Sequence, residues 1–431
     1  MQPFYLLTSR RLVPLFMTQF LGACNDNLLK NALVIFIVFH LSDSLGLNAQ
    51  LFVAIASGLF ILPFFLCSTT AGLLADKYKK SDLILRIKAV ELLLMPLAAL
   101  GFYLQNITIL MTALFLIGIQ ATFFGPLKYA ILPELLQEDE LIAGNGLIEA
   151  GTFIAILLGT ILGGTLMLHP HGKVIISSIL MALAFLGWLS AWFIPASTHA
   201  QDHLVINFNL FQELQSLFQY TQLQKDIFLS MLGISWFWLF GATLLSTLPH
   251  YTKHVLHADQ TVVTFFFALF SIGLALGSLL YTGMSKKKPH ANAIYLSLLG
   301  MTVFTLDICR SSQAYISIHV DTLMNVHQFL STPQSYGVIF DFCCIAILGG
   351  LYTVPLYTLL QSRTVAAHRA RVMACNNIMN AGCMLVSALL IMSTASLHHS
   401  SLYMLWMLAA GTGVVTWLLY QRRDQLAVNN L

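Results

Sequence analysis

The sequence is poor in charge. Asp, Glu, Lys and Arg make up 9% of its 431 residues, whereas soluble domains carry about 25%. Apolar residues make up 58%, so water cannot be the main solvent of this chain. The net charge of +3 is small and gives no reason to expect a nucleic-acid partner. The scarcity of charge therefore excludes an ordinary soluble protein and indicates one that lies in lipid.

A paired cysteine pattern is also lacking. The seven cysteines lie in or beside apolar stretches, without the paired loop spacing of a disulfide framework. We expect no cofactor and no metal. His254 and Asp259 have the H-x4-D spacing of acyltransferases, but such a pair arises readily by chance among 14 His and 18 acidic residues. We therefore do not expect an enzyme.

Long apolar runs are what the sequence does have, and they recur from Leu12 to Leu419 with short gaps. A helix needs about 20 apolar residues to cross the hydrocarbon core of a bilayer. We therefore expect an all-α membrane protein with twelve transmembrane helices. Their expected positions are residues 12–39, 49–75, 83–104, 107–132, 142–168, 173–194, 227–250, 261–284, 290–309, 336–360, 371–394 and 400–420.

The distribution of the 21 Lys and Arg residues predicts the orientation of these spans. Fourteen lie at the N-terminus, in alternate loops or at the C-terminus, and three lie in the intervening loops (Lys173, Lys253 and Arg310). Because cytoplasmic loops carry the excess of Lys and Arg, we expect both termini in the cytoplasm. Arg10 and Arg11 precede the first run, but no small-residue cleavage site follows it, so we expect that helix to be retained.

The longest polar stretch runs from Ala196 to Asp226 and leaves six expected spans on each side. We expect an N-terminal six-helix bundle at residues 1–195, a cytoplasmic linker at 196–226 and a C-terminal six-helix bundle at 227–431. Apolar residues between Val205 and Phe218 recur at helical spacing. This spacing predicts an amphipathic helix that lies either on the membrane surface or on the underside of the protein.

The two halves resemble each other in part, which indicates an internal repeat. Gly125-Pro126-Leu127, Asn145 and Glu149-Ala150-Gly151 run parallel to Val354-Pro355-Leu356, Asn376 and Asn380-Ala381-Gly382. Both copies cross the membrane in the same direction. This is typical of two bundles related by a pseudo-two-fold axis along the membrane normal. The expected architecture is therefore the major facilitator fold.

A short motif between the second and third spans is similar to the G-x-L-a-D-r signature of the major facilitator superfamily. Its residues here are Gly72, Asp76, Lys77 and Lys80. Glycine lets neighbouring helices approach closely, and an aspartate can cap or pair at a helix end. We expect these residues to form a gate on the cytoplasmic side.

Polar residues inside the spans are candidates for the substrate site, because a charge at the centre of a span costs about 2.5 to 3.5 kcal/mol. The candidates are Asn25, Asp26, Asn27, Lys30, Glu91, Lys128, Asn145 and Glu149 in the first half, and Tyr352, Asn376, Asn377 and Asn380 in the second.

Three pairings among charged residues of the first half are open. Asp26 and Lys30 are spaced i,i+4, Lys88 and Glu91 are spaced i,i+3, and Lys128 can reach Glu149 on the next helix. The last pair is either a gate that breaks and reforms or a static bridge, and the alternative is that Lys128 extends to the interface. The helix with Glu149 also carries Gly159 and Gly163, a G-x-x-x-G that predicts close helix packing.

The second half offers aromatic and amide side chains in place of charges. A charged wall facing an aromatic wall suits an amphiphile, whose headgroup and chain need different surroundings. We find no lone titratable group in this half that suggests a proton relay. This absence favours facilitated transport.

The segments that hold these candidates resemble the bacterial lysophospholipid transporters of the major facilitator superfamily. They resemble most of all the version that some bacteria fuse to an acyltransferase and acyl-carrier-protein synthetase. The segments are residues 19–31, 125–134, 145–159 and 369–377, and the resemblance covers essentially the whole chain.

This resemblance implies a flippase of the bacterial inner membrane. Such a protein moves lysophospholipids, such as lysophosphatidylethanolamine, from the outer to the inner leaflet by alternating access. It is functionally linked to a lysophospholipid acyltransferase, which reacylates the substrate. Asp26, Lys128 and Glu149 match charged positions of the family. The expected partners are the lysophospholipid and the membrane lipids.

A second hypothesis rests on histidine. Ten of the 14 histidines are expected on or near the outer face, and histidine titrates and binds metal near neutral pH. They either decorate the loops without function or belong to a proton- or metal-linked carrier of a small solute such as a siderophore.

Overall fold

The computed structural model describes residues 3–38, 49–197, 215, 218–219, 221–284, 289–316, 323–396 and 401–422. Within these residues the secondary structure is helical, with no β-strand. Twelve helices have more than 20 residues, and ten of the described helices are long and apolar enough to cross a membrane. The chain is a multi-pass membrane protein. The two long helices outside this set, α1 (Val13–Phe36) and α4 (Lys80–Tyr103), carry charges in their interior.

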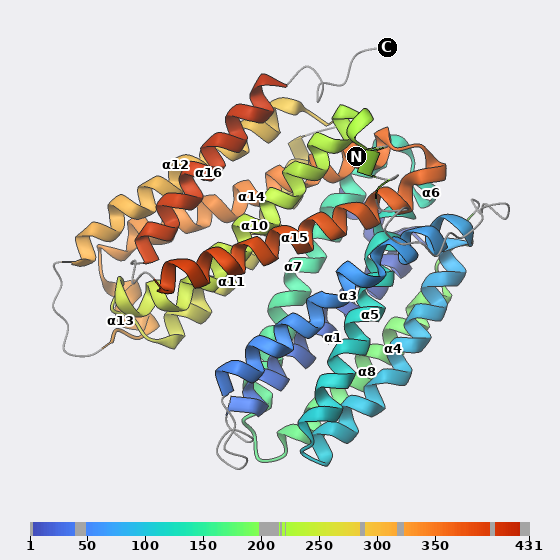
Figure 1. Ribbon diagram of the computed structural model, residues 1–431, viewed down its shortest axis with the longest axis horizontal. Helices are drawn as coiled ribbons and strands as arrows, with labels where there is room; N and C mark the ends of the chain where they lie inside the picture. Colours follow the sequence, from blue (N-terminus) through green and yellow to red (C-terminus); the bar gives the residue numbers. More distant parts are fainter. Residues whose placement is uncertain are drawn as a thin grey trace. The chain divides into compact units, whose positions relative to one another are not determined.

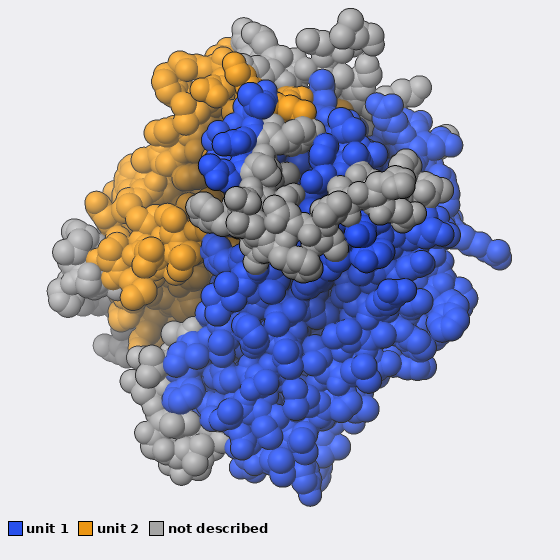
Figure 2. Space-filling view, turned by 45° about the vertical axis from the view of Figure 1, so that its right-hand side comes forward, with its two compact units in different colours: residues 1–223, 361–378 blue, residues 224–360, 379–431 orange. Residues whose placement is uncertain are grey.

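The chain divides into two compact units, which Figure 2 shows in different colours. Unit 1 comprises residues 1–223 and 361–378, and unit 2 comprises residues 224–360 and 379–431. The predicted linker at 196–226 contains the division near the middle of the chain. Segment 361–378, which we had expected in the C-terminal bundle, belongs with unit 1. The predicted amphipathic helix between Val205 and Phe218 lies almost entirely outside the described residues.

Unit 1 is built from six long helices and three short ones (Figure 1). They are η1 (Pro3–Thr8), α1, α3 (Ala49–Lys77), α4, α5 (Ile107–Ala130), α6 (Leu132–Leu135), η3 (Glu138–Glu140), α7 (Leu141–Leu166) and α8 (Gly172–Trp192). Helices α1 and α7 pack closely, as the G-x-x-x-G pattern predicts. A Cβ atom at Gly163 would lie 2.5 Å from the backbone oxygen of Leu28, and one at Gly159 would overlap the backbone of Cys24. Glycine therefore sets how near these helices come.

Unit 2 contains α10 (Lys225–His254), α11 (Gln260–Met284), α12 (Ala291–Ile316), α13 (Val326–Ser331), most of α14 (Ser335–Arg363), most of α15 (Arg369–Ser396) and α16 (Ser401–Gln421). The end of α14, the short helix η4 (Ala366–His368) and the start of α15 belong to unit 1. Here α11 and α14 make the close approach, because a Cβ atom at Gly277 or Gly350 would overlap the facing backbone. Pro126 lies inside α5 and Pro355 inside α14, at the positions that the internal repeat relates.

Helix α12 continues to Ile316, beyond the expected end of this span at residue 309. Arg310, which the sequence placed in a loop, therefore lies within the helix. Its guanidinium Nε donates to the Oδ1 atom of Asp307 at 2.6 Å, and such an i,i+3 pair supports the helix across this turn.

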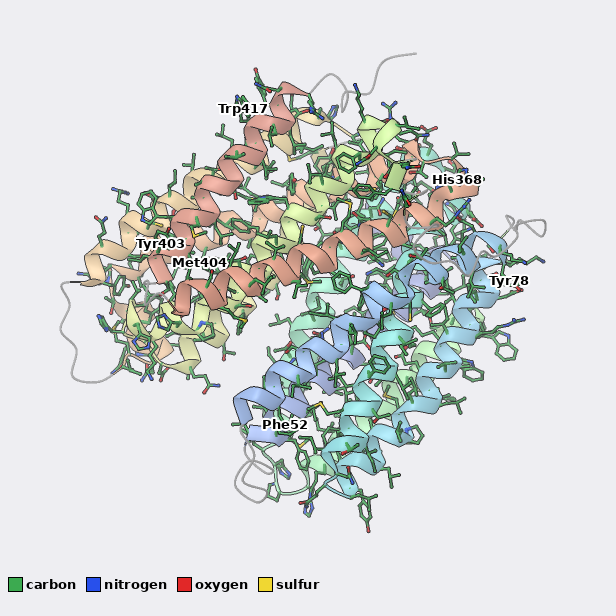
Figure 3. All side chains as sticks on the ribbon, in the orientation of Figure 1. Phe52, Tyr78, His368, Tyr403, Met404 and Trp417 are labelled. Carbon is green, nitrogen blue, oxygen red and sulfur yellow. The ribbon has the colours of Figure 1, made fainter. Side chains whose placement is uncertain are left out.

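Helix α16 carries both exposed and buried large side chains. Trp417 and Tyr403 are exposed, whereas Met404, next to Tyr403, is buried (Figure 3). Exposed apolar side chains of this kind are normal for a helix whose outer solvent is lipid, and amphipathic Trp and Tyr suit the membrane interface.

Candidate functional site

A network of buried polar side chains joins three helices inside unit 1, with Glu91 of α4 at its centre. Glu91 accepts hydrogen bonds from Asn25 of α1 at 3.2 Å, from Lys88 at 2.5 Å and from Gln120 of α5 at 2.9 Å. The structure confirms the predicted pairing of Lys88 with Glu91. A buried ion pair is stable only when further hydrogen bonds satisfy it, and Asn25 and Gln120 supply them. Glu91 therefore holds helices together and has little capacity left for a ligand.

Lys88 is enclosed as completely as its partner, with 1% of its surface exposed. Its Nζ atom lies 4.4 Å from the ring centroid of Phe124, a cation–π contact. Gly22 leaves the space for it, since a Cβ atom there would overlap the ammonium group. The sequence did not predict roles for Gln120 and Gly22, because neither residue type indicates a function inside a span.

Asp26 and Lys30 do not form the direct ion pair that their i,i+4 spacing predicted. Lys30 places its Nζ atom 4.4 Å from the ring centroid of Phe60 on α3. The Oδ1 atom of Asp26 is buried and has no hydrogen-bond partner. The side chain rotamer of Lys30 thus favours the aromatic face over the carboxylate. Asp26 is left within the electrostatic field of Lys88, Lys30 and Lys128, and also of Glu91.

Lys128 and Glu149 likewise form no direct ion pair in the described part of the chain. Instead, the Tyr129 hydroxyl donates a hydrogen bond to Glu149, and the Nζ atom of Lys128 lies 4.8 Å from the Tyr129 ring centroid. The predicted bridge is therefore absent here, because Tyr129 takes the place of the lysine. Tyr129 is the neighbour of Lys128 in sequence, yet nothing in the pattern distinguishes it from a packing aromatic.

Seven charged residues of unit 1 lie in the interior of the expected spans. They are the acids Asp26, Glu91 and Glu149 and the bases Lys30, Arg86, Lys88 and Lys128. Of these seven, all in the described part of the chain, only Lys88 and Glu91 form an ion pair with each other. The other charged groups are not paired among themselves, so the interior of unit 1 presents separate positive and negative groups.

The asparagines predicted from the sequence differ in their contacts. Asn27 bonds to the backbone oxygen of Ala23 on its own helix at 2.8 Å, as polar residues inside helices often do. Asn145 of α7 forms a reciprocal pair with Gln361, in which each amide nitrogen donates to the other's oxygen, at 2.6 and 2.9 Å. Asn377 fills the space beside Gly125 of α5, and Asn376 has a buried oxygen without a partner.

The predicted gate motif meets the start of α15 within unit 1. Asp76, at the end of α3, accepts hydrogen bonds from the backbone nitrogens of Ala370 and Arg371 at 3.0 and 3.2 Å and from the Arg371 Nε atom at 3.0 Å. The carboxylate thereby caps the positive end of a helix. Gly72 lets the helices meet, since a Cβ atom there would lie 2.9 Å from the Arg371 Cα atom.

The two lysines of the motif differ. Lys80 forms an ion pair with Glu134 of α6 at 2.7 Å, with 2% and 3% of the side chains exposed. Lys77 lies over the ring of Tyr78, with its Nζ atom 5.8 Å from the centroid. The sequence named the motif but not its partners Arg371 and Glu134, which lie on other helices.

A third cluster ties the N-terminus to the same unit. Glu140 accepts hydrogen bonds from both terminal nitrogens of Arg11, at 2.9 and 2.8 Å, and from the Tyr5 hydroxyl. Burial, together with the hydrogen bond to Glu140, raises the pKa of Tyr5 to about 12. The Tyr5 hydroxyl therefore stays protonated at neutral pH and continues to donate.

The candidates in unit 2 serve its internal packing. Tyr352 donates to the backbone oxygen of Gly233 at 2.9 Å. Asn380 accepts a hydrogen bond from Ser235 at 2.8 Å, so α10 and α15 meet through neutral polar groups. The amide series of α15 thus has Asn376 and Asn377 in unit 1 and Asn380 in unit 2.

Histidines gather in one place on α10. His250 and His254 have ring centroids 4.4 Å apart, and His250 lies 3.2 Å from the Ser401 hydroxyl. Within the described residues, no three His, Cys, Asp or Glu side chains converge as a metal site would require. His40, His319, His398 and His399 lie outside the described residues.

The family model of the Major Facilitator Superfamily matches residues 15–388 of this chain. The chain belongs to this superfamily. Its fold is the major facilitator fold, as the sequence predicted. Known transporters of similar sequence include the lysophospholipid transporter LplT of Escherichia fergusonii, 28% identical over 365 residues (83% of this chain and 81% of that protein). LplT of Citrobacter koseri is 29% identical over 360 residues (82% and 81%).

Solved structures of similar fold include two transporters with different substrates. The human organic anion transporter MFSD10 (TETRAN) has a TM-score of 0.73 at 14% identity and covers 97% of this chain and 99% of its own. A bacterial homologue of the iron transporter ferroportin in an outward-facing state has a TM-score of 0.70 at 14% identity (96% and 100%). At such identity the likeness concerns the fold alone.

Proposed function

We propose that this chain is a lysophospholipid transporter of the bacterial inner membrane. It moves its substrate from the outer to the inner leaflet by alternating access. The observation that carries the proposal is the set of separated charges in unit 1: Asp26 has a buried oxygen without a partner, and Lys30 and Lys128 rest on aromatic rings. A lysophosphatidylethanolamine headgroup carries one ammonium and one phosphate, so it needs separate acidic and basic groups.

The roles of the residues follow from charge. Asp26 accepts hydrogen bonds from the headgroup ammonium, and Lys128 binds the phosphate. Both side chains are partly exposed, whereas Lys88 and Glu91 are fully buried. Charge-assisted hydrogen bonds in a site shielded from water are about twice as strong as neutral ones. Glu149, held by Tyr129, and the paired Lys88 and Glu91 position the helices rather than touch the substrate.

The gate motif supplies the moving part of the cycle. Asp76 holds the start of α15, and Asn145 holds Gln361 at the end of α14. Alternating access requires these contacts to break and reform. Because Lys and Arg concentrate at this end of the spans, the gate faces the cytoplasm, as do both termini.

The named relatives support the substrate class, since the LplT proteins are lysophospholipid transporters by name. Delivery to the inner leaflet places the substrate where a lysophospholipid acyltransferase can reacylate it. Removal of the substrate by such an enzyme would draw transport inward. No observation on the described residues favours the siderophore carrier.

Reconstituted proteoliposomes test the proposal. Labelled lysophosphatidylethanolamine is added to the outside, and its passage to the inner leaflet is followed as protection from an impermeant quencher. We expect Asp26→Asn and Lys128→Met each to lower the rate about tenfold or more, because a hydrogen bond to a charged group contributes about 1.5 to 3 kcal/mol. Transport at the wild-type rate in both variants would refute the proposed headgroup site.

The controls separate substrate binding from stability and orientation. Asp82→Asn removes an exposed acid at the start of α4 and should leave transport unchanged. Thermal midpoints of all variants should match the wild type. Cysteines introduced at exposed His171 and Lys79 report the orientation, since an impermeant maleimide should reach only the former from the periplasmic side.

A further inference from the structure

Unit 2 holds a buried acid that the transport site does not use. Asp341 of α14 has 1% of its surface exposed. Its Oδ1 atom has no hydrogen-bond partner, and its Oδ2 atom accepts a hydrogen bond from Ser311 of α12 at 3.4 Å. Asp341, which lies between Phe340 and Phe342 in the sequence, is a buried titratable group of this half that the sequence pattern does not single out.

A second carboxyl group faces Asp341. Asp307 of α12 lies one turn before Ser311, the residue that donates to Asp341, and therefore lies on the same face of that helix. Asp307 is itself paired with Arg310 at 2.6 Å. Tyr251 of α10 and Cys344 of α14 also interact electrostatically with Asp341, and neither side chain supplies a second cation. Two acids therefore share one cation, and that cation is 79% exposed.

One excess negative charge in this place is costly. Moving an unpaired carboxylate out of water is so unfavourable that the group takes up a proton instead, and two adjacent carboxyl groups cannot both ionise readily. A protonated carboxyl can donate to the carboxylate beside it. This arrangement uses the proximity of Asp307 and leaves Arg310 with one anion to neutralise.

We propose that Asp307 and Asp341 together bind one proton, with Asp341 carrying it as a neutral carboxyl group that donates to the Asp307 carboxylate. The site lies between α12 and α14. Asp307 is partly exposed, so protons exchange through it. This proposal concerns the second unit alone and does not depend on which substrate the first unit binds.

A small cation is the rival occupant. Hard cations such as Ca²⁺ take about six to eight oxygen ligands, whereas the two carboxyl groups and Ser311 offer fewer, and the Ser311 hydroxyl already donates to Asp341. The donor set therefore fits a proton better than a metal ion.

Infrared spectroscopy of the purified full-length protein in lipid nanodiscs at neutral pH tests the proposal. The carbonyl stretch of a protonated carboxyl group is resolved from that of a carboxylate, and labelling with ¹³C-aspartate identifies the aspartate contribution. We expect a protonated band that is lost in Asp341→Asn and that persists in Asp341→Glu without the aspartate isotope shift. Asp82→Asn is the matched control and should retain the band. Asp26→Asn separates any contribution from unit 1.

Two results would overturn the proposal. One is an unchanged band in Asp341→Asn, which would show that Asp341 is ionised. The other is a saturable gain in thermal stability with sodium chloride over choline chloride in the wild type that Asp341→Asn abolishes, which would assign the site to a cation. Asparagine mimics the neutral acid in shape, so this variant should fold. If Asp341→Asn does not fold, the ¹³C isotope shift in the wild-type spectrum is the test. Absence of a protonated aspartate band in the wild type would refute the proposed site.

Discussion

Helix α4 in unit 1 and helix α12 in unit 2 are each the third long helix of their unit, and each carries an ion pair at i,i+3 spacing. In the pair Lys88–Glu91 the side chains are 2% and 1% exposed, whereas in the pair Asp307–Arg310 they are 36% and 79% exposed, respectively. Asn25 and Gln120 complete the first pair from neighbouring helices. The same i,i+3 spacing thus gives a buried ion pair that links three helices in unit 1 and an exposed ion pair in unit 2.

The difference comes from what surrounds the pair. Gly22 makes room for the Lys88 ammonium and Phe124 covers it, so the charges are removed from their solvent and must satisfy each other. Arg310 has no such enclosure. Spacing along one helix therefore predicts that two charged side chains can form an ion pair. How much that pair contributes to stability depends on whether other helices bury it.

Breaking the enclosed pair should have the largest effect. Lys88→Met leaves Glu91 as a buried carboxylate without its cation, which costs about 3 to 5 kcal/mol. We expect a large fall in the thermal midpoint of the protein in detergent or nanodiscs. Arg310→Met, the corresponding change in unit 2, should leave the midpoint nearly unchanged.

A double variant distinguishes loss of charge pairing from loss of packing. Lys88→Met/Glu91→Gln removes both charges and keeps an amide to bond with Asn25 and Gln120, so it should recover most of the stability. Equal midpoints for Lys88→Met and Arg310→Met would show that enclosure by other helices does not decide how much an ion pair contributes to stability.

The contrast also explains what sequence could predict. The helical, multi-pass character of the chain and the close packing at Gly159 and Gly163 follow from patterns within single helices, and the structure has them. The contacts of Lys30, Glu149 and Asp341 depend instead on which side chains of other helices lie beside them. Periodicity along one helix carries no information on that choice.

The packing of helix pairs extends the comparison. Unit 1 joins its first and fifth long helices, α1 and α7, through glycine. Gly163→Ala would place a Cβ atom 2.5 Å from the Leu28 backbone oxygen, and overpacking of this kind costs about 1 to 3 kcal/mol. We expect a moderate fall in the thermal midpoint.

The next residue provides a matched control for this substitution. A Cβ atom at Gly164 meets nothing within 4 Å, and alanine is favoured over glycine within a helix by about 1 kcal/mol. Gly164→Ala should therefore leave the midpoint equal or raise it. If both alanines have the same effect, helix propensity and not the α1–α7 contact controls this region.

The equivalent helices of unit 2, α10 and α15, meet through hydroxyl groups, and here the effect should be smallest. Thr243 donates to Ser387 at 2.7 Å, and both side chains are buried. Thr243→Val keeps the shape and removes the donor, and such bonds within membrane proteins contribute about 0.6 kcal/mol on average. Adding Ser387→Ala removes the second partner, so the double variant should be no less stable than Thr243→Val alone, because replacing both partners can be nearly neutral. Thermal midpoints of the two single variants and the double variant measure this coupling.

A fall in the midpoint of Thr243→Val as large as that of Lys88→Met would contradict the contrast between the units. It would show that unit 2 depends on its neutral contacts as strongly as unit 1 depends on its charges.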